Sequence, residues 1–509
     1  MNALRTSWLA KPWFWLLALV VFRGAFSVAL PMTGDESYFV LWGEHPAGGY
    51  YDHPPMVGWW LSGLLGISRA EWVLRLPSTL LPLLLAWGGW WLARPYGFER
   101  ARLAAILILL QPANVWNVLI TTDTPAILFS MLSVLAYVAA LRRGGRPGAS
   151  LFWHALAGAL LGLAFLGKYF AALLGFAYLA HVSLARRDAG RWAGFAALLL
   201  AALPAPFYNL WWNSGHCWTN ILFNFMNRHG ASGVTWTNPA LYLASLLYLL
   251  TPWLMVALWR ERRWLDDALP RDVAGKAVLY LALVPLSVFA LMSVFRPVGL
   301  HWMLSFTPLL AALAAMALPV ASLRHVMRWA AGFALVHMLA FSIILALPIQ
   351  TWQKTKLYDG IVLTMRGDEL MTHLSPFADD YLFAMDGYSP AATMSYNANR
   401  HFAVFGEGSS YARQDDFVTD WRAWDGRNVL ILRKSEPRAG DYSAYFRRVE
   451  LRTFEVLGAQ YWIVLGQGFD YSAYHGKVLA RIRDRFYQIP AWLPQRACEF
   501  CERYFPEVK

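Results

Sequence analysis

The stretch Trp13–Leu30 reads WFWLLALVVFRGAFSVAL, and the polar motif Gly34–Tyr38 (GDESY) follows it closely. About 20 apolar residues cross the hydrocarbon core of a bilayer, so we expect Trp13–Leu30 to be a transmembrane helix. It is long, contains Arg23 and lacks a small-residue cleavage pattern, which argues against a cleaved signal peptide. Acidic groups beside a membrane span are costly to desolvate, and the motif therefore marks a candidate reaction site.

The composition is that of a polytopic membrane protein. Hydrophobic residues make up 58% of the 509 residues and charged residues only 15%, against about 25% charged in soluble proteins. The 27 Trp and 23 Tyr suit a membrane–water interface, where an amphipathic ring contacts both lipid and water. The net charge of +12 does not indicate a nucleic-acid partner, because the basic residues lie mostly between apolar spans, as membrane topology requires.

About eleven apolar segments are candidate membrane spans. They cover residues 13–31, 72–93, 102–119, 124–141, 151–166, 169–185, 192–211, 239–259, 277–295, 301–319 and 328–348. Alternate connections are rich in arginine, and these lie around residues 94–102, 142–146, 186–191, 260–276 and 324–328. By the positive-inside rule these connections are cytoplasmic. An odd number of spans then places the N-terminus in the cytoplasm and the region after about Gln350 outside.

Two domains are predicted. Residues 1–349 form a transmembrane domain with a catalytic outer loop at 32–70, and residues 350–509 form an α/β domain on the outer face. The second region has more charges and turn residues and only short apolar runs. Two strands and an amphipathic helix are predicted within it, at Val429–Leu432, Tyr461–Leu465 and Tyr471–Phe486. In a bacterium this topology predicts a multi-pass inner-membrane protein with a periplasmic C-terminal domain.

The chain has three cysteines. Cys217 stands alone in the sequence, while Cys498 and Cys501 form a Cys-x-x-Cys pair. No thioredoxin-like context surrounds the pair, so a structural role is favoured over redox catalysis. A second pair of zinc ligands is missing from the sequence, which disfavours a zinc site.

The first outer loop carries the strongest functional signal. Asp35 and Glu36 follow the first span, and Asp52-His53-Pro54-Pro55 comes later in the same loop. Carboxylates and a histidine gathered in a short polar loop suit acid–base or phosphate chemistry. Each group also has a structural alternative. Asp35 and Glu36 are well placed to cap a helix that starts near Ser37, and the prolines are typical of a turn that starts an interfacial helix over 57–65.

The other outer connections add further charged groups. Asp123 in Thr-Thr-Asp-Thr-Pro is either an N-cap or a site residue. Lys168, beside Tyr169, either snorkels to the interface or binds an anionic partner, since the outer loops are otherwise poor in basic residues. The same question applies to Arg228, Arg296 and His301. Together these groups suit a phosphate-bearing lipid: the cations hold the phosphate leaving group, and a carboxylate deprotonates an acceptor or binds a divalent metal ion.

These motifs resemble those of the GT-C integral-membrane glycosyltransferases, which use polyprenyl-phosphate sugars. The similarity is to bacterial enzymes related to lipid A aminoarabinose transferase and to protein O-mannosyltransferases. It is carried by Gly34–Tyr38, Tyr51–Met56, Thr122–Pro125, Leu166–Tyr169 and Trp211–Asn213, and in the C-terminal region by Gly387–Tyr396 and Gly406–Trp421. The resemblance extends over nearly the whole chain, and the two motifs of the first loop are its most specific part.

The resemblance implies a role for each candidate residue. Asp35 is the principal loop carboxylate with Glu36 beside it, and Asp52 and His53 complete the catalytic set. Aminoarabinose transferases commonly have Glu-Lys at the position of Asp52-His53, so this departure favours relatives that transfer other sugars, such as galacturonic acid or glucosamine. The implied donor-phosphate ligands are Lys168, Tyr169, Arg228, Arg296 and His301, with Asp123 in support. Where a divalent metal ion is present, Asp35 and Asp52 are its candidate ligands.

The predicted function is transfer of a sugar from an undecaprenyl-type phosphate donor to lipid A or lipopolysaccharide on the periplasmic face. A protein, or another glycan or lipid, is the alternative acceptor for the same chemistry. A transporter or flippase of lipid-linked sugars would have charges near mid-helix and repeated halves, whereas here the charges cluster on one face and no repeat is found. A non-catalytic scaffold would tolerate the joint loss of Asp35, Asp52 and Lys168. The sugar and the acceptor stay open.

Overall fold

The computed structural model describes residues 12–144, 146–188, 190–227, 233–262 and 272–507. The chain forms two compact units, each built from separate stretches of sequence. The helical unit contains residues 1–30, 69–208 and 231–345, and the mixed unit contains residues 31–68, 209–230 and 346–509. The predicted domain boundary near residue 350 thus separates only part of the mixed unit. Most of the predicted outer loop, residues 32–68, and the segment 209–227 belong to the same unit as the C-terminal region.

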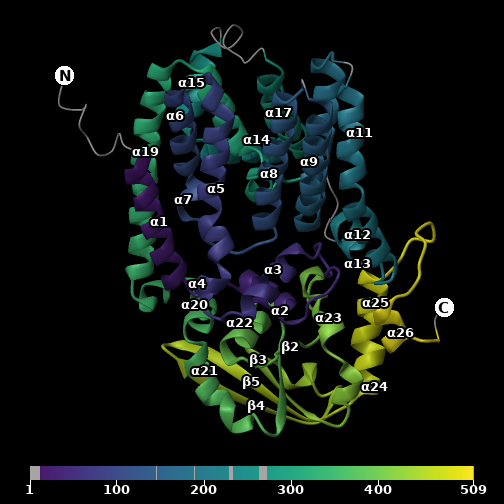
Figure 1. Ribbon diagram of the computed structural model, residues 1–509. Helices are drawn as coiled ribbons and strands as arrows, with labels where there is room; N and C mark the ends of the chain where they lie inside the picture. Colours follow the sequence, from purple (N-terminus) through teal and green to yellow (C-terminus); the bar gives the residue numbers. More distant parts are fainter. Residues whose placement is uncertain (1–11, 145, 189, 228–232, 263–271, 508–509) are drawn as a thin grey trace. The chain divides into compact units, whose positions relative to one another are not determined.

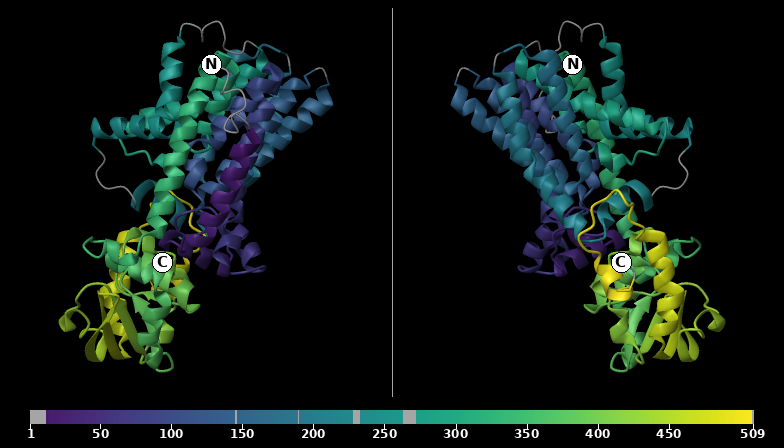
Figure 2. Two further views of the ribbon diagram at one scale, coloured as in Figure 1. Left: turned by 90° about the vertical axis from the view of Figure 1, so that its left-hand side faces the viewer. Right: turned by 90° about the vertical axis from the view of Figure 1, so that its right-hand side faces the viewer.

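The helical unit is a bundle of long apolar helices (Figure 1). Its helices are α1 Pro12–Ala29, α4 Glu71–Leu74, α5 Leu76–Ala93, α6 Phe98–Leu109, α7 Pro112–Trp116, α8 Asp123–Arg142, α9 Pro147–Gly167, α10 Ala172–Ala180, α11 Arg191–Ala202, α14 Thr237–Leu250, α15 Pro252–Arg260, α17 Val273–Ser293, α18 Thr307–Ala317 and α19 Val320–Ala346; α12, Pro204–Ser214, continues into the mixed unit. Helix α19 lies along α1 in both sets of views (Figures 1 and 2), and the Phe341 and Phe26 rings are 5.6 Å apart.

The backbones of helices α8, α9 and α11 approach each other closely in this bundle. A Cβ atom on Gly158 of α9 would lie 1.9 Å from the carbonyl oxygen of Leu198 in α11, so only glycine fits there. On the neighbouring side, the Ser133 hydroxyl of α8 donates to the carbonyl of Ala157 at 2.7 Å. Small residues therefore let α8, α9 and α11 pack with no large side chain between their backbones, as is common in membrane bundles.

Six helices of the described residues are long and apolar enough to cross a membrane, or up to eight if each of two bent helix pairs is one span. This supports a multi-pass membrane protein. The count of eleven spans stays a prediction, because two of the predicted segments correspond to shorter apolar helices, at Tyr169–Ala185 and Thr307–Ala317. The predicted span at 102–119 is likewise divided between α6 and α7.

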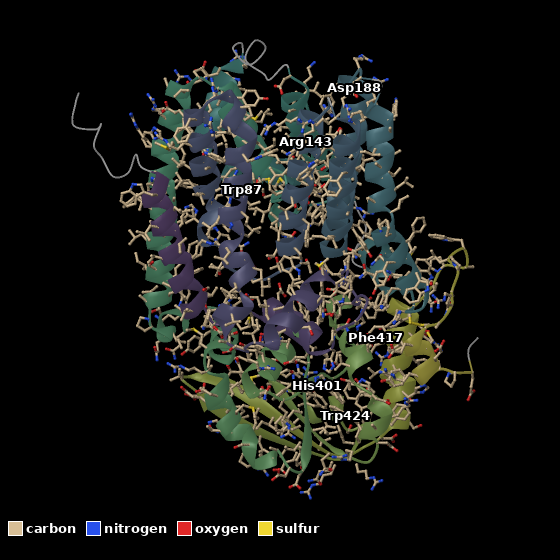
Figure 3. The ribbon with its side chains drawn as sticks, in the orientation of Figure 1. Trp87, Arg143, Asp188, His401, Phe417 and Trp424 are labelled. Atoms are coloured by element: carbon tan, nitrogen blue, oxygen red, sulfur yellow. A yellow bond between two sulfur atoms is a disulfide. The ribbon has the colours of Figure 1, made fainter. Side chains whose placement is uncertain are left out.

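Arginines of the basic connections cap helix ends in the helical unit. Arg100 donates to the carbonyls of Ala315, Met316 and Leu318 at 2.9, 3.0 and 2.7 Å, where α18 ends. Arg142 likewise donates to the last turn of α5. The last carbonyls of a helix lack amide partners and carry partial negative charge, so a guanidinium stabilises them. Figure 3 shows Arg143 and Asp188 toward the same end of this bundle.

The mixed unit is built on a five-stranded sheet with the strand order β2-β1-β3-β5-β4. Its strands are β1 Tyr381–Met385, β2 Ala403–Val404, β3 Asn428–Arg433, β4 Phe446–Val456 and β5 Ala459–Phe469. Strands β2, β1 and β3 are parallel, and β5 and β4 add antiparallel to β3. Strands β3 and β5 contain the two predicted apolar runs, so both strand predictions are confirmed. The predicted α/β class of this region is confirmed with them.

Helices cover both faces of the sheet (Figure 1). Val429 and Ile431 of β3 belong to one hydrophobic core, and Leu430 and Leu432 to the other, as the two-residue period of a strand requires. The second core contains side chains of α20 Tyr358–Met365, α21 Gly367–Leu374 and α22 Tyr388–Ala398, and the first contains those of α24 Tyr471–Tyr474, α25 Ala480–Phe486 and α26 Glu499–Tyr504. Helices α24 and α25 are joined by one π-helical turn, which confirms the helix predicted at 471–486.

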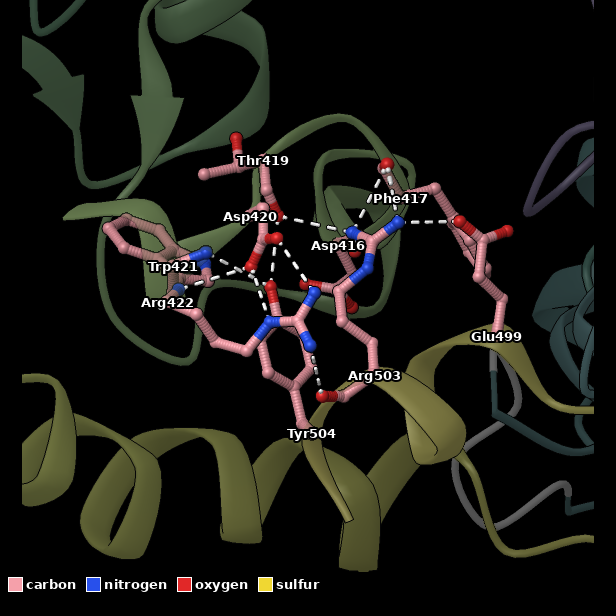
Figure 4. A network of polar contacts seen from close by, with 9 residues as sticks. All are labelled: Asp416, Phe417, Thr419, Asp420, Trp421, Arg422, Glu499, Arg503 and Tyr504. Atoms are coloured by element: carbon pink, nitrogen blue, oxygen red, sulfur yellow. Dashed lines mark hydrogen bonds and ion pairs between the residues drawn. The ribbon is translucent and has the colours of Figure 1, made fainter. Parts of the chain in front are cut away.

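The C-terminal helix α26 holds the short helix α23, Asp415–Val418, in place (Figure 4). Arg503 donates to three backbone carbonyls, those of Asp416 at 3.1 Å, Phe417 at 3.3 Å and Thr419 at 3.4 Å. The Glu499 carboxylate accepts from the same guanidinium at 2.5 Å. One charged side chain thereby satisfies carbonyls that a four-residue helix cannot pair by itself.

A disulfide joins Cys217 to Cys498 across 281 residues of sequence, and both cysteines lie in the mixed unit. Cys217, isolated in the sequence, therefore has a partner in the fold, and Cys498 is not paired with its neighbour in the Cys-x-x-Cys motif. Cys501 is a free thiol, and burial raises its pKa. Proximity in the fold rather than in the sequence decides this pairing.

The disulfide gives a direct test of the fold of the mixed unit. Digestion without reductant should yield one linked peptide pair containing Cys217 and Cys498, with Cys501 alkylated only after unfolding. Cys217→Ser should lower the free energy of unfolding by about 2–4 kcal/mol, measured by thermal or chemical denaturation in detergent. Cys501→Ser, the matched control, should leave stability unchanged. A linked Cys498–Cys501 peptide would contradict this pairing.

Candidate active site

The predicted carboxylates Asp35 and Glu36 lie in the first turn of α2, Gly34–Glu44, in the mixed unit. Thr33 and Glu36 form a capping box: the Thr33 hydroxyl accepts from the Glu36 amide, and the Glu36 carboxylate accepts from the Thr33 amide at 3.1 Å. Glu36 is fully buried, whereas Asp35 is exposed. Glu36 thus stabilises a helix start, as the structural alternative proposes, but the helix begins at Gly34 and not near Ser37, and its N-cap is Thr33.

Asp35 instead contacts a residue far along the chain. The Tyr388 hydroxyl donates to Asp35 Oδ1 at 3.0 Å, and the side chain of Ser389 packs against Gly34, where a Cβ atom would clash at 1.8 Å. Tyr388 is the first residue of α22, so two helix N-termini meet here. Both helix dipoles favour the negative charge of Asp35. Burial raises the pKa of the Tyr388 phenol, and the charges of Asp35 and Asp52 raise it further, which keeps this group a neutral donor.

Asp52 and His53 occupy a tight turn lined by aromatic rings. The Tyr50 amide donates to the His53 carbonyl at 3.0 Å, and the Tyr50 ring stacks on Trp42 at 4.4 Å. The His53 ring also lies near Phe223, with 6.5 Å between centroids. Helix α3, Met56–Leu65, starts directly after the two prolines, as predicted for 57–65. The turn and the helix start are thus both present, and they hold Asp52 and His53 in fixed positions.

Several buried polar atoms around Asp52 make no hydrogen bond with the described residues. They include the Tyr38 hydroxyl, Asp52 Oδ1 and His53 Nδ1. Asp52 Oδ2 lies 3.4 Å from His53 Nδ1, in ion-pair range only if the imidazole is protonated. An unsatisfied buried polar group costs about 1–3 kcal/mol, so a cluster of them marks a place where a polar ligand would be bound.

Residues that the sequence did not single out hold this turn. Gln414 Oε1 accepts from the Tyr51 amide at 2.8 Å, and Asn224 Nδ2 donates to the Asp52 carbonyl at 3.0 Å. Asn220 Nδ2 donates to the Tyr50 carbonyl at 2.7 Å. Amide side chains that bond backbone groups leave no sequence pattern. Gln414 and Tyr388 lay within stretches that carried the family resemblance, whereas Asn220 and Asn224 did not. Residues of the two segments 209–227 and 406–421 therefore support the turn at Asp52 and His53.

Among the described residues, no third potential ligand joins Asp35 and Asp52, the candidate ligands of a metal ion. Among the described residues, no group of three or more His, Cys, Asp or Glu side chains lies close enough to hold a metal ion. The donor set thus offers little to a divalent cation, which prefers six or more oxygen ligands or several fixed nitrogen or sulfur ligands. We derive no step from a metal.

The helical unit holds the predicted site residues Asp123, Lys168, Tyr169, Arg296 and His301. Asp123 is the first residue of α8, and Lys168 is the C-cap of α9. Lys168 Nζ lies 2.8 Å from both carboxylate oxygens of Asp123, and the residues are 8% and 9% exposed. Thr122, and not Asp123, is the N-cap residue of α8, so the N-cap alternative does not hold for Asp123. The pair is instead an ion pair in which each charge offsets the desolvation of the other.

Tyr169 and His301 are brought near one another by an aromatic contact. The Phe170 and Trp302 rings, which follow Tyr169 and His301 directly, have centroids 4.2 Å apart. His301 is exposed and Arg296 is half-buried, and both belong to the helical unit. Arg228 lies outside the described residues. Three of the five predicted phosphate ligands, Lys168, Tyr169 and His301, therefore lie on adjoining segments of one unit.

A pocket next to the Asp123–Lys168 pair contains a buried charge that the sequence did not assign to a site. Arg23, Asn114, Asn117 and Asp123 are among its lining residues. Arg23 donates to four backbone carbonyls, including that of Ser78 at 2.5 Å. Pro82 of α5 has no amide hydrogen and so leaves the Ser78 carbonyl without a helical donor, which Arg23 replaces. The buried arginine joins α1 to α5 and α7 and leaves the pocket polar.

The arrangement in the mixed unit suits proton transfer or polar binding. Asp35 is an exposed carboxylate positioned by a neutral phenol, a geometry suited to a general base or to an acceptor of substrate hydroxyl groups. Asp52 and His53 add fixed, buried polar atoms beside it. The helical unit supplies cations beside an apolar bundle, as a lipid phosphate requires.

Comparison with known proteins agrees with this geometry. A family model described as dolichyl-phosphate-mannose-protein mannosyltransferase matches residues 52–212. ArnT from Cupriavidus metallidurans bound to undecaprenyl phosphate has a similar fold, with a TM-score of 0.61 at 16% identity, over 89% of this chain and 98% of that one. The same protein in the apo state gives a TM-score of 0.60 at 15% identity, over 88% and 97%. No curated protein sequence matches the chain.

The two comparisons confirm the resemblance to GT-C glycosyltransferases. The matched family segment contains Asp52, His53, Asp123 and Lys168, and the shared fold extends over most of the chain. Part of the sequence is thus similar to a mannosyltransferase family, and the fold is similar to that of ArnT.

The Asp123–Lys168 pair gives a test of charge burial. Asp123→Ala should lower stability by about 3–5 kcal/mol, because it removes the carboxylate that offsets the charge of a buried ammonium, whereas the double variant Asp123→Leu/Lys168→Met should recover most of that loss. Thermal unfolding in detergent measures both. The exposed pair Arg324–Glu99, 2.6 Å apart, is the matched control, and Glu99→Gln should cost at most about 1 kcal/mol. Equal losses at the two pairs would contradict the assignment.

Proposed function

We propose that this protein transfers a sugar from an undecaprenyl-type phosphate donor to lipid A or lipopolysaccharide on the periplasmic face of a bacterial inner membrane. The observation that carries the proposal is the exposed carboxylate of Asp35, held at 3.0 Å by Tyr388 between two helix N-termini and near the polar turn of Asp52 and His53. The similarity to ArnT and the mannosyltransferase family model support this choice of chemistry.

The reaction is a displacement at the anomeric carbon of the donor sugar. An acceptor oxygen forms a bond to that carbon, the bond from the carbon to the phosphate oxygen breaks, and polyprenyl phosphate leaves with the bonding electrons. Where the acceptor is a hydroxyl group, Asp35 takes its proton as general base. Where the acceptor is an ionised lipid A phosphate, no base is needed, and Asp35 orients sugar hydroxyls with Tyr388.

The donor phosphate is proposed to bind the cations of the helical unit. His301 and Arg296 are accessible to an anion, and Arg228 is the further cation predicted from the sequence. Lys168 Nζ donates to both carboxylate oxygens of Asp123. We therefore propose that Lys168 fixes the neighbouring segment at Tyr169 as well as neutralising charge on the donor phosphate. Charge develops on the phosphate oxygens as the leaving group departs, and positioned cations stabilise it.

The periplasmic location is supported by the cysteines as well as by the arginine distribution. Disulfides persist in oxidising compartments such as the bacterial periplasm and are rare in the cytosol. The Cys217–Cys498 bond lies in the mixed unit, which also contains Asp35 and Asp52. The proposed orientation puts the mixed unit in the periplasm and the N-terminus in the cytoplasm.

The test compares envelope lipids and glycans of a deletion strain with those of complemented strains by mass spectrometry. Wild-type protein should restore a sugar that the deletion removes, and Asp35→Asn should not, with a loss of at least about 100-fold for a lost general base. Asp368→Asn is the matched control, because Gly367-Asp368-Glu369 starts α21 of the same unit with the same tripeptide.

Each outcome has a distinct meaning. Restoration by Asp35→Asn would contradict the assigned role, provided that the variant protein is present in the membrane. A sugar missing from protein or from another glycan would identify the alternative acceptor. If the deletion strain accumulates a lipid-linked sugar on one leaflet while the sugar transfer itself still occurs, the protein is a flippase instead.

A further inference from the structure

The connection between α25 and α26 exposes apolar side chains on the mixed unit. It runs through residues 487–498 and contains Ile489-Pro490-Ala491-Trp492-Leu493-Pro494. Trp492 is 73% exposed. A tryptophan ring is rarely left in water, because burying it is among the largest apolar gains a side chain can make. The loop therefore needs a partner that accepts an aromatic ring with a polar edge.

The loop is tied to the end of a membrane-spanning helix. Residues 191–214 are one of the six candidate spans, and Ser214 is its last residue. The Arg496 amide donates to the Ser214 carbonyl at 2.8 Å, and the Trp218 indole donates to the Pro494 carbonyl at 3.1 Å. The Cys217–Cys498 disulfide closes the same junction. The loop is therefore fixed to the C-terminal end of this apolar helix.

The other end of the loop is fixed to the same segment. Asn227 Nδ2 donates to the Phe486 carbonyl at 2.9 Å. The loop thus runs beside residues 214–227, and Figure 1 shows it next to α13, Thr219–Leu222. Phe225 and Met226 on this segment are 63% and 41% exposed. Two neighbouring stretches thus present apolar side chains to the surroundings of the mixed unit.

Basic side chains flank these apolar groups. Arg485 and Arg496 are exposed, and the Arg496 guanidinium lies 5.0 Å above the ring of Trp211, itself 57% exposed. Tryptophan with arginine is the composition of a membrane interface, where the ring sits at headgroup level and the cation binds lipid phosphate. A soluble partner is not required by any of these groups, and continuity with the span favours the bilayer.

We propose that the loop at residues 487–498 anchors the mixed unit on the lipid surface. Trp492 and Leu493 enter the headgroup region of the bilayer, and Arg485 and Arg496 bind the phosphates of lipid headgroups. The disulfide fixes the loop at the end of the span, so the anchor and the span enter the same leaflet. This proposal rests on the membrane span and not on the transfer reaction.

Depth in the bilayer can be measured on the full-length protein. Trp492→Cys in a Cys501→Ser background is labelled with a nitroxide and reconstituted into vesicles of phosphatidylethanolamine and phosphatidylglycerol. Collision with oxygen, which partitions into lipid, should exceed collision with a water-soluble nickel chelate. A label at Leu451→Cys is the control, because Leu451 is an equally apolar residue, 39% exposed on edge strand β4, and should show the reverse.

A second variant tests the basic groups. Arg485→Gln with Arg496→Gln should lower the oxygen-to-nickel collision ratio at position 492 several-fold, toward that of the control. A label at 492 as accessible to the nickel chelate as the label at 451 would overturn the proposal. So would spin–spin broadening that grows with protein density in the bilayer, since it would show that a second copy of the chain covers the loop. Loss of sugar transfer in Asp35→Asn leaves these ratios unchanged, so failures of the two proposals are distinguishable.

Discussion

The covalent bond between Cys217 and Cys498 is the constraint on which the mixed unit depends. This unit gathers three stretches of chain that are distant in sequence, and each must be brought together against the entropy of a long loop. The hydrogen bonds of Tyr51, Asn220 and Asn224 across these stretches contribute about 1 kcal/mol each. The disulfide removes conformations from the unfolded chain and so favours the assembly that those weaker bonds then orient.

The catalytic proposal follows from that assembly. Asp35 reaches Tyr388 only because the loop after the first span packs on α22 of the C-terminal region. Its neighbour Glu36 is held by Thr33 and serves the helix. Two adjacent carboxylates thus have different tasks because one side chain points back along its own backbone and the other points to another segment. The same unit carries the exposed Trp492 loop, so the bonds that build the site also hold a surface suited to lipid.

In the helical unit, charged groups are stabilised by backbone carbonyls as much as by opposite charges. Arg23, Arg100 and Arg142 each donate to carbonyls at or near helix ends or at a proline. An apolar environment raises the cost of an unpaired carbonyl as well as of an unpaired cation, so each satisfies the other. Asp123 and Lys168, which the sequence predicted separately as site residues, form an ion pair within this unit.

The sequence by itself determined the class of the protein. Long apolar segments between arginine-rich connections can only be accommodated in a membrane, and the runs Val429–Leu432 and Tyr461–Leu465 could only be buried strands of a mixed region, because both patterns are local consequences of burial. The sequence also predicted a helix start at Asp35 and Glu36, while the structure showed that Thr33 is its N-cap. The partners of Asp35, Lys168 and Cys217 were decided only by the tertiary structure. Each pairs with a group between 45 and 353 residues away, and such pairs depend on how helices and loops pack rather than on any local pattern.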